Sequence, residues 1–271
     1  MRTLLAIVLA VPLGAVWCRA ATPSIEQAYR QMYDLDFNGA HRTLAAWEHL
    51  HPEDPMGPAS DAAAWLYGEF DRMHILQSEL FVNNNSFFHS RKVSPDPAVK
   101  QKFEADLAAG RQLAERVLAR SPTDANALLA RMLCTGLHSD YLALIEKRYV
   151  AALSEVKATR ELAEKALAIH PDLYDAYIAI GEENYILSQK AAPVRWILHM
   201  SGSQTDKDTG IEKLRLTAEK GRYFGPYAKL LLAVADLRDK NVAHARQKLA
   251  WLAAEFPHNR LYREELAKLR S

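Results

Sequence analysis

Residues 166–171 read ALAIHP, an apolar helical stretch that a proline ends, and residues 177–181, shortly after it, read YIAIG. The combination of an apolar stretch and a proline recurs as LAAWEHLHP (44–52), VLARSP (117–122) and LAAEFP (252–257). Proline lacks the backbone N–H and clashes with the preceding turn, so each of these prolines ends a helix. The recurrence predicts repeated pairs of helices, with a proline between the end of one pair and the start of the next.

The spacing of apolar residues also indicates a helical chain. Ile25, Ala28, Tyr29, Met32 and Tyr33 recur at the spacing that places them on one face of a helix. No stretch alternates apolar and polar residues for long enough to indicate a strand. A single pair of helices cannot bury its apolar face, so we expect successive pairs to stack in an all-α fold.

The composition excludes several classes of protein. Of the 271 residues, 49% are hydrophobic and 25% are charged, as in soluble globular proteins and unlike disordered, collagen-like or polytopic membrane proteins. The 34 Lys and Arg residues balance the 33 Asp and Glu residues. Because nucleic-acid-binding proteins carry a strong basic excess, we expect no nucleic-acid partner.

The repeated pairs resemble those of the tetratricopeptide repeat (TPR) family. YIAIG (177–181) fits the large–x–x–Leu–Gly step of the family's first helix, in which the small Gly181 lets the paired helix approach closely. In the unit spanning 226–257, the matching positions are Leu232, Ala233, Ala245, Leu249, Leu252 and Pro257. In the N-terminal unit they are Phe37, Ala40, Leu44, Trp47 and Pro52. The resemblance implies an all-α, TPR-like α-solenoid of antiparallel helical hairpins with a C-terminal capping helix over 259–270.

The first twenty residues have the layout of a secretory signal peptide. After a short positive start comes an apolar run over 4–16, too short to span a bilayer, and the small residues Cys18 and Ala20 permit cleavage after Ala20. The bulky residue before Cys18 argues against lipidation there. An uncleaved anchor and a buried first helix are the alternatives. We expect a signal peptide at 1–20 and one TPR-like domain at 21–271, in an exported bacterial protein that is periplasmic or secreted.

Two irregular insertions interrupt the repeats. The first, 81–97, contains NNNS (83–86), which favours a structured loop and also matches a glycosylation acceptor. The second, 188–210, predicts a short helix from Pro193 that packs on the solenoid, with Val194, Ile197 and Leu198 on one side. It resembles a segment of bacterial TPR proteins related to a eukaryotic family associated with the mitochondrial outer membrane. Its candidate contact residues are Arg195, Trp196 and His199.

The sequence carries none of the common catalytic or metal-binding motifs. HExxH, paired CxxC, a phosphate-binding glycine loop and G-x-S-x-G are all missing. His41, His49 and His51 are the densest histidine group, but their spacing does not suit a shared ligand set, so we interpret them as solvated. We expect no metal and no cofactor.

Three further residues with reactive side chains are given structural interpretations. Cys134 lies in the apolar stretch LLARMLC and is expected to be a buried, inert thiol. Glu182 and Glu183 are adjacent in a helix and do not face one cleft, so we interpret them as solvated or as salt-bridge partners.

TPR solenoids bind peptides or proteins in the groove that their first helices line, and the resemblance implies such a groove here. Tyrosine is favoured at such contacts because it offers apolar area and a hydroxyl group at little entropic cost. Packing between repeats is the alternative role for each candidate. The groove candidates are Tyr29, Tyr33, Asp175, Ile178, Glu182, Tyr185, Tyr227, Leu230 and Arg238.

These features lead to three hypotheses about function. The first is a non-catalytic protein- or peptide-binding scaffold of the bacterial cell envelope, with no small-molecule substrate inferred. The second is a membrane-associated assembly factor that docks through 188–210. The third and least favoured is an enzyme, which would need a deep pocket with converging polar side chains, whereas a smooth open groove would exclude it.

Overall fold

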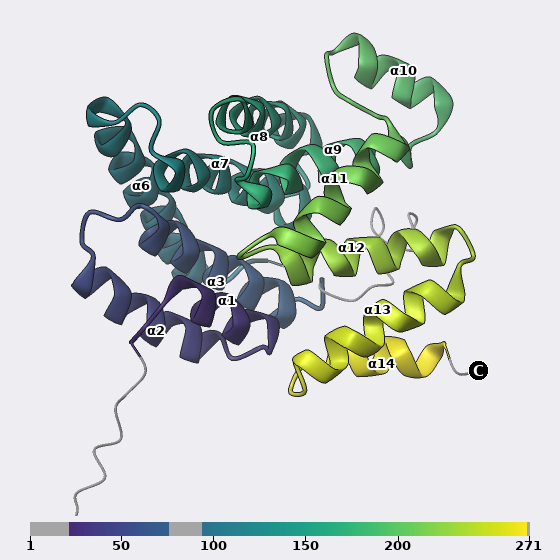
Figure 1. Ribbon diagram of the computed structural model, residues 1–271, viewed down its shortest axis with the longest axis horizontal. Coiled ribbons are helices and arrows are strands. Elements are labelled where there is room, and N and C mark those ends of the chain that lie inside the picture. The colour runs from purple at the N-terminus through teal and green to yellow at the C-terminus, as the bar shows by residue number, and fades with distance from the viewer. Residues whose placement is uncertain (1–21, 76–93, 270–271) are drawn as a thin grey trace, which may run out of the picture.

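The computed structural model describes residues 22–75 and 94–269, of which 79% are helical, with no strand among them. The all-α prediction is therefore confirmed for this part of the chain. Two short turns of other helix types are present, η1 (Tyr141–Ile145) after α7 and η2 (Tyr174–Ala176) before α9. The α-helices (Figure 1) are α1 (Ile25–Tyr33), α2 (Phe37–Leu50), α3 (Met56–Arg72), α6 (Pro97–Arg120), α7 (Ala125–Asp140), α8 (Tyr149–Ile169), α9 (Tyr177–Ser188), α10 (Ala192–Met200), α11 (Lys207–Lys220), α12 (Gly225–Arg238), α13 (Val242–Glu255) and α14 (Arg260–Lys268).

Two of the predictions fall outside the described residues. The signal peptide expected at 1–20 lies there, as does the first insertion, 81–97, up to residue 93. The second insertion is described, and α10 begins at Ala192, next to the proline at which a short helix was expected.

The helices pack in pairs that follow the chain. α1 packs on α2, α3 on α6, α7 on α8, α9 on α11 and α12 on α13. As predicted, helices α2, α6, α8 and α13 end two residues before Pro52, Pro122, Pro171 and Pro257. α11 ends at Lys220 without a proline, so the sequence pattern does not mark the end of that pair.

Short polar side chains fix the starts of many helices. Each accepts a hydrogen bond from a backbone N–H of the first turn, which would otherwise lack a partner within the helix. The residues that cap helices in this way are Ser24, Asp36, Asp96, Asp124, Asp206 and Asn259.

Glycines allow α9 and α11 to pack closely. A Cβ atom on Gly181 of α9 would lie 3.0 Å from the Cγ atom and from the backbone nitrogen of Leu214. A Cβ atom on Gly210 of α11 would lie 2.6 Å from the backbone nitrogen of Tyr185. The predicted role of Gly181 is confirmed, and Gly210 has the same role on the partner helix. Helix α10 is therefore an excursion between two helices that pack directly on each other.

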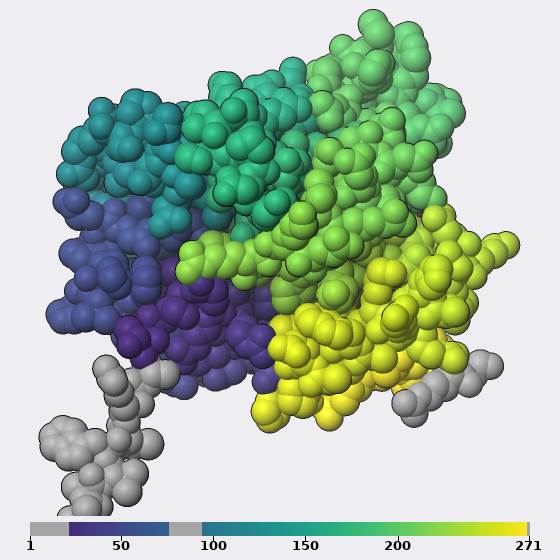
Figure 2. All heavy atoms as spheres, viewed as in Figure 1, coloured from purple at the N-terminus to yellow at the C-terminus, as the bar shows by residue number. Residues whose placement is uncertain are grey.

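The last helices of the chain, α13 and α14, lie beside the first helix, α1, so the first and last helix pairs are neighbours (Figures 1 and 2). The Tyr33 hydroxyl donates to the carbonyl of Tyr223 at 2.9 Å, and the Asn259 amide donates to the carbonyl of Tyr33 at 2.7 Å. Arg30 forms an ion pair with Glu255 at 2.7 Å. The helix expected as a terminal cap, α14, exists, but its first turn lies against α1 rather than at a free end.

Candidate functional site

A cavity of about 410 Å³ lies where the inward faces of the helices meet. Side chains from α1, α2, α3, α7, α8, α9, α10, α12 and α14 line it, so nearly every helix pair contributes to its wall. The lining is mostly apolar and includes Met32, Phe70, Leu144, Val156, Leu231 and Leu261. Because α14 and α1 meet, the space between the inward faces is closed on that side, where an open-ended stack would leave it open.

Four polar side chains from four different helices line one part of this cavity. Tyr67 comes from α3, Asp140 from the end of α7, Glu182 from α9 and Tyr227 from α12. The Tyr227 hydroxyl group donates a hydrogen bond to Glu182 at 3.0 Å. We call these four residues the acidic cluster.

The environment of the acidic cluster shifts both of its carboxylic acids toward the protonated form. Burial raises the pKa of Glu182 to about 7, and the hydrogen bond from Tyr227 opposes this shift. Burial raises the pKa of Asp140 well above its usual value, and the nearby charge of Glu182 raises it further. Two carboxylates in an apolar wall repel each other and lack water to solvate them, so the ionised pair is costly.

Six of the nine predicted groove residues line this cavity. They are Tyr33, Glu182, Tyr185, Tyr227, Leu230 and Arg238. The resemblance to TPR proteins therefore selected residues that face the same space, but this space is a partly open cavity lined by many helices and not a groove that the first helices alone line.

The other three groove candidates do not line the main cavity. Tyr29 is 1% exposed and packs edge-on against Phe224 with the ring centroids 5.4 Å apart. Asp175 accepts backbone hydrogen bonds of 2.8–2.9 Å from residues 222–224 and so fixes the start of α12. Ile178 is buried and borders a void of about 50 Å³ behind the acidic cluster. For Tyr29 and Asp175 the structure assigns a packing or capping role.

Helix α10 has two apolar faces. Val194 and Leu198 line the cavity, whereas Trp196, Ile197 and Met200 are 67%, 61% and 70% exposed. Ile197 was expected on the same side as Val194 and Leu198, and it is one turn after Val194, but it does not line the cavity with them and borders the exposed face. Figure 1 shows α10 at a corner of the molecule, and Figure 2 shows that it protrudes there.

The three candidate contact residues of α10 have different environments. Arg195 is half-buried and donates to the carbonyl oxygen of Lys190 at 2.9 Å, which holds the start of α10 to the end of α9. Trp196 and His199 are exposed. Trp196 and His199 are thus available for contact, and Arg195 has a structural role.

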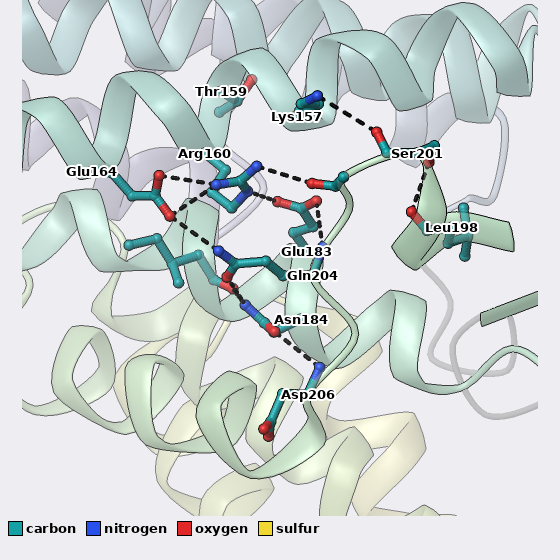
Figure 3. A network of polar contacts seen from close by, with 12 residues as sticks. Lys157, Thr159, Arg160, Glu164, Glu183, Asn184, Leu198, Ser201, Gln204 and Asp206 are labelled. Atoms are coloured by element: carbon teal, nitrogen blue, oxygen red, sulfur yellow. Dashed lines mark hydrogen bonds and ion pairs between the residues drawn. The ribbon is translucent and has the colours of Figure 1, made fainter. Parts of the chain in front are cut away.

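A network of polar side chains fixes the chain where it returns from α10 (Figure 3). Arg160 of α8 forms an ion pair with Glu183 at 2.8 Å and donates to the carbonyl of Gly202 at 3.2 Å. Asn184 donates to the side chain of Gln204 at 2.8 Å and accepts from the backbone of Asp206 at 2.9 Å. These hydrogen bonds hold the loop over residues 202–206 against α8 and α9. They therefore fix the position at which the chain leaves α10.

The two adjacent glutamates, Glu182 and Glu183, which the sequence analysis treated together, have different partners. Glu183, 2% exposed, is a salt-bridge partner, as one of the two interpretations expected. Glu182 faces the cavity and is hydrogen-bonded to Tyr227, so the interpretation of a solvated side chain is wrong for both residues.

The other interpretations of reactive residues are mostly confirmed. His49 and His51 are exposed, but His41 is half-buried and lies 2.5 Å from Asp61, so it is not simply solvated. Cys134 is buried, and burial raises the pKa of its thiol to about 12. No group of three or more metal-ligating side chains occurs within residues 22–75 and 94–269.

Sequence reasoning missed Asp140 and Tyr67. Asp140 stands beside the apolar stretch YLALI (141–145), and an acidic residue next to such a stretch is the signal that could have identified it. Its partners come from helices far away in the chain, so spacing alone does not bring them together.

Comparison with known proteins adds no relative to this description. No protein-family model matches the chain, and no curated protein matches it. Among the helices that the structure describes, each one is too short or too polar to cross a membrane. The cavity and helix α10 therefore carry the functional argument.

Proposed function

We propose that this protein is a binding protein that holds a small, mainly apolar ligand in its central cavity. The observation that carries the proposal is the cavity of about 410 Å³ with its mostly apolar wall. This volume lies within the range of about 300–1,000 Å³ that is usual for small-molecule sites, which are apolar with a few placed polar groups. The acidic cluster supplies such polar groups.

The proposal keeps the remaining expectations from the sequence. We infer an exported, periplasmic or secreted protein with one TPR-like solenoid domain, whose two ends are brought together by α14. The predicted scaffold function would place a peptide in an open groove. A cavity of about 410 Å³ suits a ligand of small-molecule size better, although a short apolar peptide segment belongs to the same chemical class.

Blocking the cavity tests the proposal. Ala143 lines the cavity, and Ala143→Phe places an aromatic ring in it. Ala254, on the exposed side of α13, provides the matched control Ala254→Phe. Binding is measured by the fluorescence of N-phenyl-1-naphthylamine, a neutral apolar probe. We expect saturable binding to the wild type and to Ala254→Phe, and at least a roughly tenfold loss of affinity in Ala143→Phe.

Two results would overturn this proposal. One is the absence of saturable probe binding to the wild type. The other is equal binding by Ala143→Phe and Ala254→Phe when circular dichroism shows both variants to be folded, because the probe would then occupy another surface.

A second candidate function, docking on a membrane surface, is favoured by the outer face of α10. Trp196, Ile197 and Met200 form an exposed apolar face, and aromatic residues of this kind favour the interface between water and lipid. Val194 lines the cavity and is also 45% exposed, so the same helix borders the cavity. An apolar ligand would then pass from lipid to cavity along α10.

Sedimentation with vesicles of phosphatidylcholine and phosphatidylglycerol tests membrane docking. The wild type should sediment with the vesicles, and the double variant Trp196→Ser with Ile197→Ser should stay largely in the supernatant. Val150, 88% exposed, provides the control Val150→Ser, which should sediment as the wild type does. Sedimentation of the double variant to the same extent as the wild type would contradict docking through α10.

The non-catalytic function remains a prediction. The enzyme hypothesis required a deep pocket with converging polar side chains, and the cavity with its acidic cluster has both features. We expect a bound ligand to be recovered unchanged in mass after long incubation with the protein. Conversion of the ligand, lost in Glu182→Gln, would favour the enzyme instead.

A further inference from the structure

The exposed apolar face of α10 lies where the cavity opens to solvent. Tyr149, in the first turn of α8, and Val194 of α10 both line the cavity and are exposed. Trp196, Ile197 and Met200 continue the exposed apolar surface along α10, which protrudes from the molecule (Figure 2). A partner that covers this face therefore also lies beside the opening through which an apolar ligand reaches the cavity.

The stretch of chain around α10 carries positive charges and no negative ones. No Asp or Glu occurs between Glu183 and Asp206, a stretch that contains α10 and both of its connections. Lys190 precedes α10, and Arg195 lies near its start. The amino group of Lys157, from α8, lies 3.5 Å from the carbonyl oxygen of the residue that follows α10 (Figure 3). Cations therefore lie at both ends of the exposed apolar face.

Basic residues beside an exposed apolar helix face are complementary to a membrane surface that carries anionic lipids. A helix that lies in the interface binds through its buried apolar area and through the attraction between its cations and anionic head groups. Three exposed apolar side chains provide a small area, so stable attachment needs the electrostatic contribution as well. A lipid surface also brings apolar molecules to the opening of the cavity, which a protein partner would cover instead.

We infer that α10 docks on a lipid surface that carries anionic phospholipids, with the opening of the cavity toward the lipid. This inference rests on the membrane docking proposed above and names the class of lipid. The three exposed apolar residues of α10 enter the interface, and the cations at its two ends lie near the head groups. His199 is exposed and follows Trp196 by three residues on the helix, so a charge placed at this position faces the head groups.

Vesicles of different charge test this inference. Vesicles of phosphatidylcholine alone are compared with vesicles of equal parts phosphatidylcholine and phosphatidylglycerol, and sedimentation gives the partition coefficient of the wild type. We expect roughly tenfold or tighter binding to the anionic vesicles, because each Lys or Arg near an anionic surface contributes a factor of about five. Salt at about 1 M should remove most of this difference, because the Debye length is then about 3 Å.

Charge variants of His199 assign the effect to α10. On the anionic vesicles, His199→Lys should bind roughly fivefold more tightly than the wild type and His199→Glu roughly fivefold more weakly. On phosphatidylcholine vesicles, both should bind as the wild type does. His49, an exposed histidine of α2, provides the matched controls His49→Lys and His49→Glu. Both should stay within about twofold of the wild type, because salt screens charges away from the docked face.

The outcomes separate this inference from the proposed functions. Equal binding of the wild type to both kinds of vesicle, or no effect of the charge at position 199, would overturn the anionic lipid and leave docking through the apolar face. The absence of binding to either kind of vesicle would overturn docking and this inference together, and would favour a protein partner for this face. Binding of N-phenyl-1-naphthylamine in the cavity is measured independently of both.

Discussion

The two sides of helix α9 differ in how they are packed. On one side, Gly181 lies so close to Leu214 of α11 that a Cβ atom would be 3.0 Å from it. On the other side, Glu182 and Ile186 face a cavity of about 410 Å³. Close packing of one side follows from a local glycine, whereas the cavity on the other side exists because distant helices diverge and then meet again. The close contact between α9 and α11 thus fixes how these helices pair, and the cavity lies where the side chains of α9 and the distant helices leave space between them.

Adjacent glutamates provide the strongest test of this difference. Glu183 is buried and paired with Arg160, whose side chain is 8% exposed. Glu183→Ala leaves Arg160 with Glu164 as its remaining ion-pair partner, and it leaves the backbone N–H of Gln204 without its acceptor. We expect a loss of about 3 kcal/mol in the free energy of unfolding. Urea unfolding followed by circular dichroism measures it. Glu182→Ala, on the cavity side, should be neutral or stabilising at pH 8, and an equal loss in both variants would contradict the distinction.

A pair of glycines gives the next largest effect. Gly210→Ala brings a Cβ atom to 2.6 Å from the backbone of Tyr185, so helices α9 and α11 must separate. We expect a loss of about 1–3 kcal/mol. Gly136 lines the cavity, and its added Cβ would lie 3.4 Å from the nearest atom, an ordinary contact. Gly136→Ala should therefore lie within about 1 kcal/mol of the wild type in the same urea experiment. Equal losses would show that the contact between α9 and α11 is no closer than the packing of α7, which carries Gly136, at the cavity wall.

The pH dependence of the unfolding free energy tests the environment of Glu182, on the side of α9 that faces the cavity. Because burial raises the pKa of Glu182 from 4.5 to about 7, the native state binds this proton more tightly than the unfolded state does. This contribution to stability is present below pH 4.5 and is lost as the pH rises through 7.

Glu182→Gln removes that dependence. Relative to the wild type it should gain roughly 1–3 kcal/mol between pH 5 and pH 8. Glu48 and Asp106, whose pKa values burial also raises to about 7, affect both proteins equally and cancel in the difference. Asp140 does not cancel, because the charge of Glu182 raises its pKa, so the difference reports on the two acids together. Parallel stability profiles for the two proteins would contradict the burial of Glu182.

The smallest effect is expected on α10. Trp196 is 67% exposed, so Trp196→Ser removes little buried area and should change the unfolding free energy by no more than about 0.5 kcal/mol. Thermal unfolding measures this change. A larger loss would mean that the outer face of α10 is packed in solution, which would remove the argument for membrane docking.

Much of the helical arrangement follows from local sequence. Prolines mark the ends of α2, α6, α8 and α13 because proline cannot continue a helix, and Gly181 marks a close approach because only glycine fits there. The end of α11 was not recognised because Gly221 follows it without a proline.

The candidate site was only partly predictable. Repeat positions selected Glu182, Tyr185 and Tyr227 correctly as residues of the inward face. They could not select Asp140 or show that the face encloses a cavity, because both depend on helices that the chain brings together over long distances. Asp175 was assigned to the groove for its position in the repeat, but its carboxylate accepts the backbone N–H groups of the residues that lead into α12.

The meeting of α1 with α13 and α14 has a consequence for how the chain folds. In a linear array of repeats each unit contacts only its neighbours, so folding can begin anywhere and spread. Here Tyr33 bonds Tyr223 and Asn259, contacts that span roughly 190 residues or more and carry the entropic cost of closing a long loop. The end of α1 at Tyr33 therefore reaches its final contacts only after the last hairpin has been synthesised. Removal of that hairpin would expose this end of α1, which would keep its packing on α2 and α3.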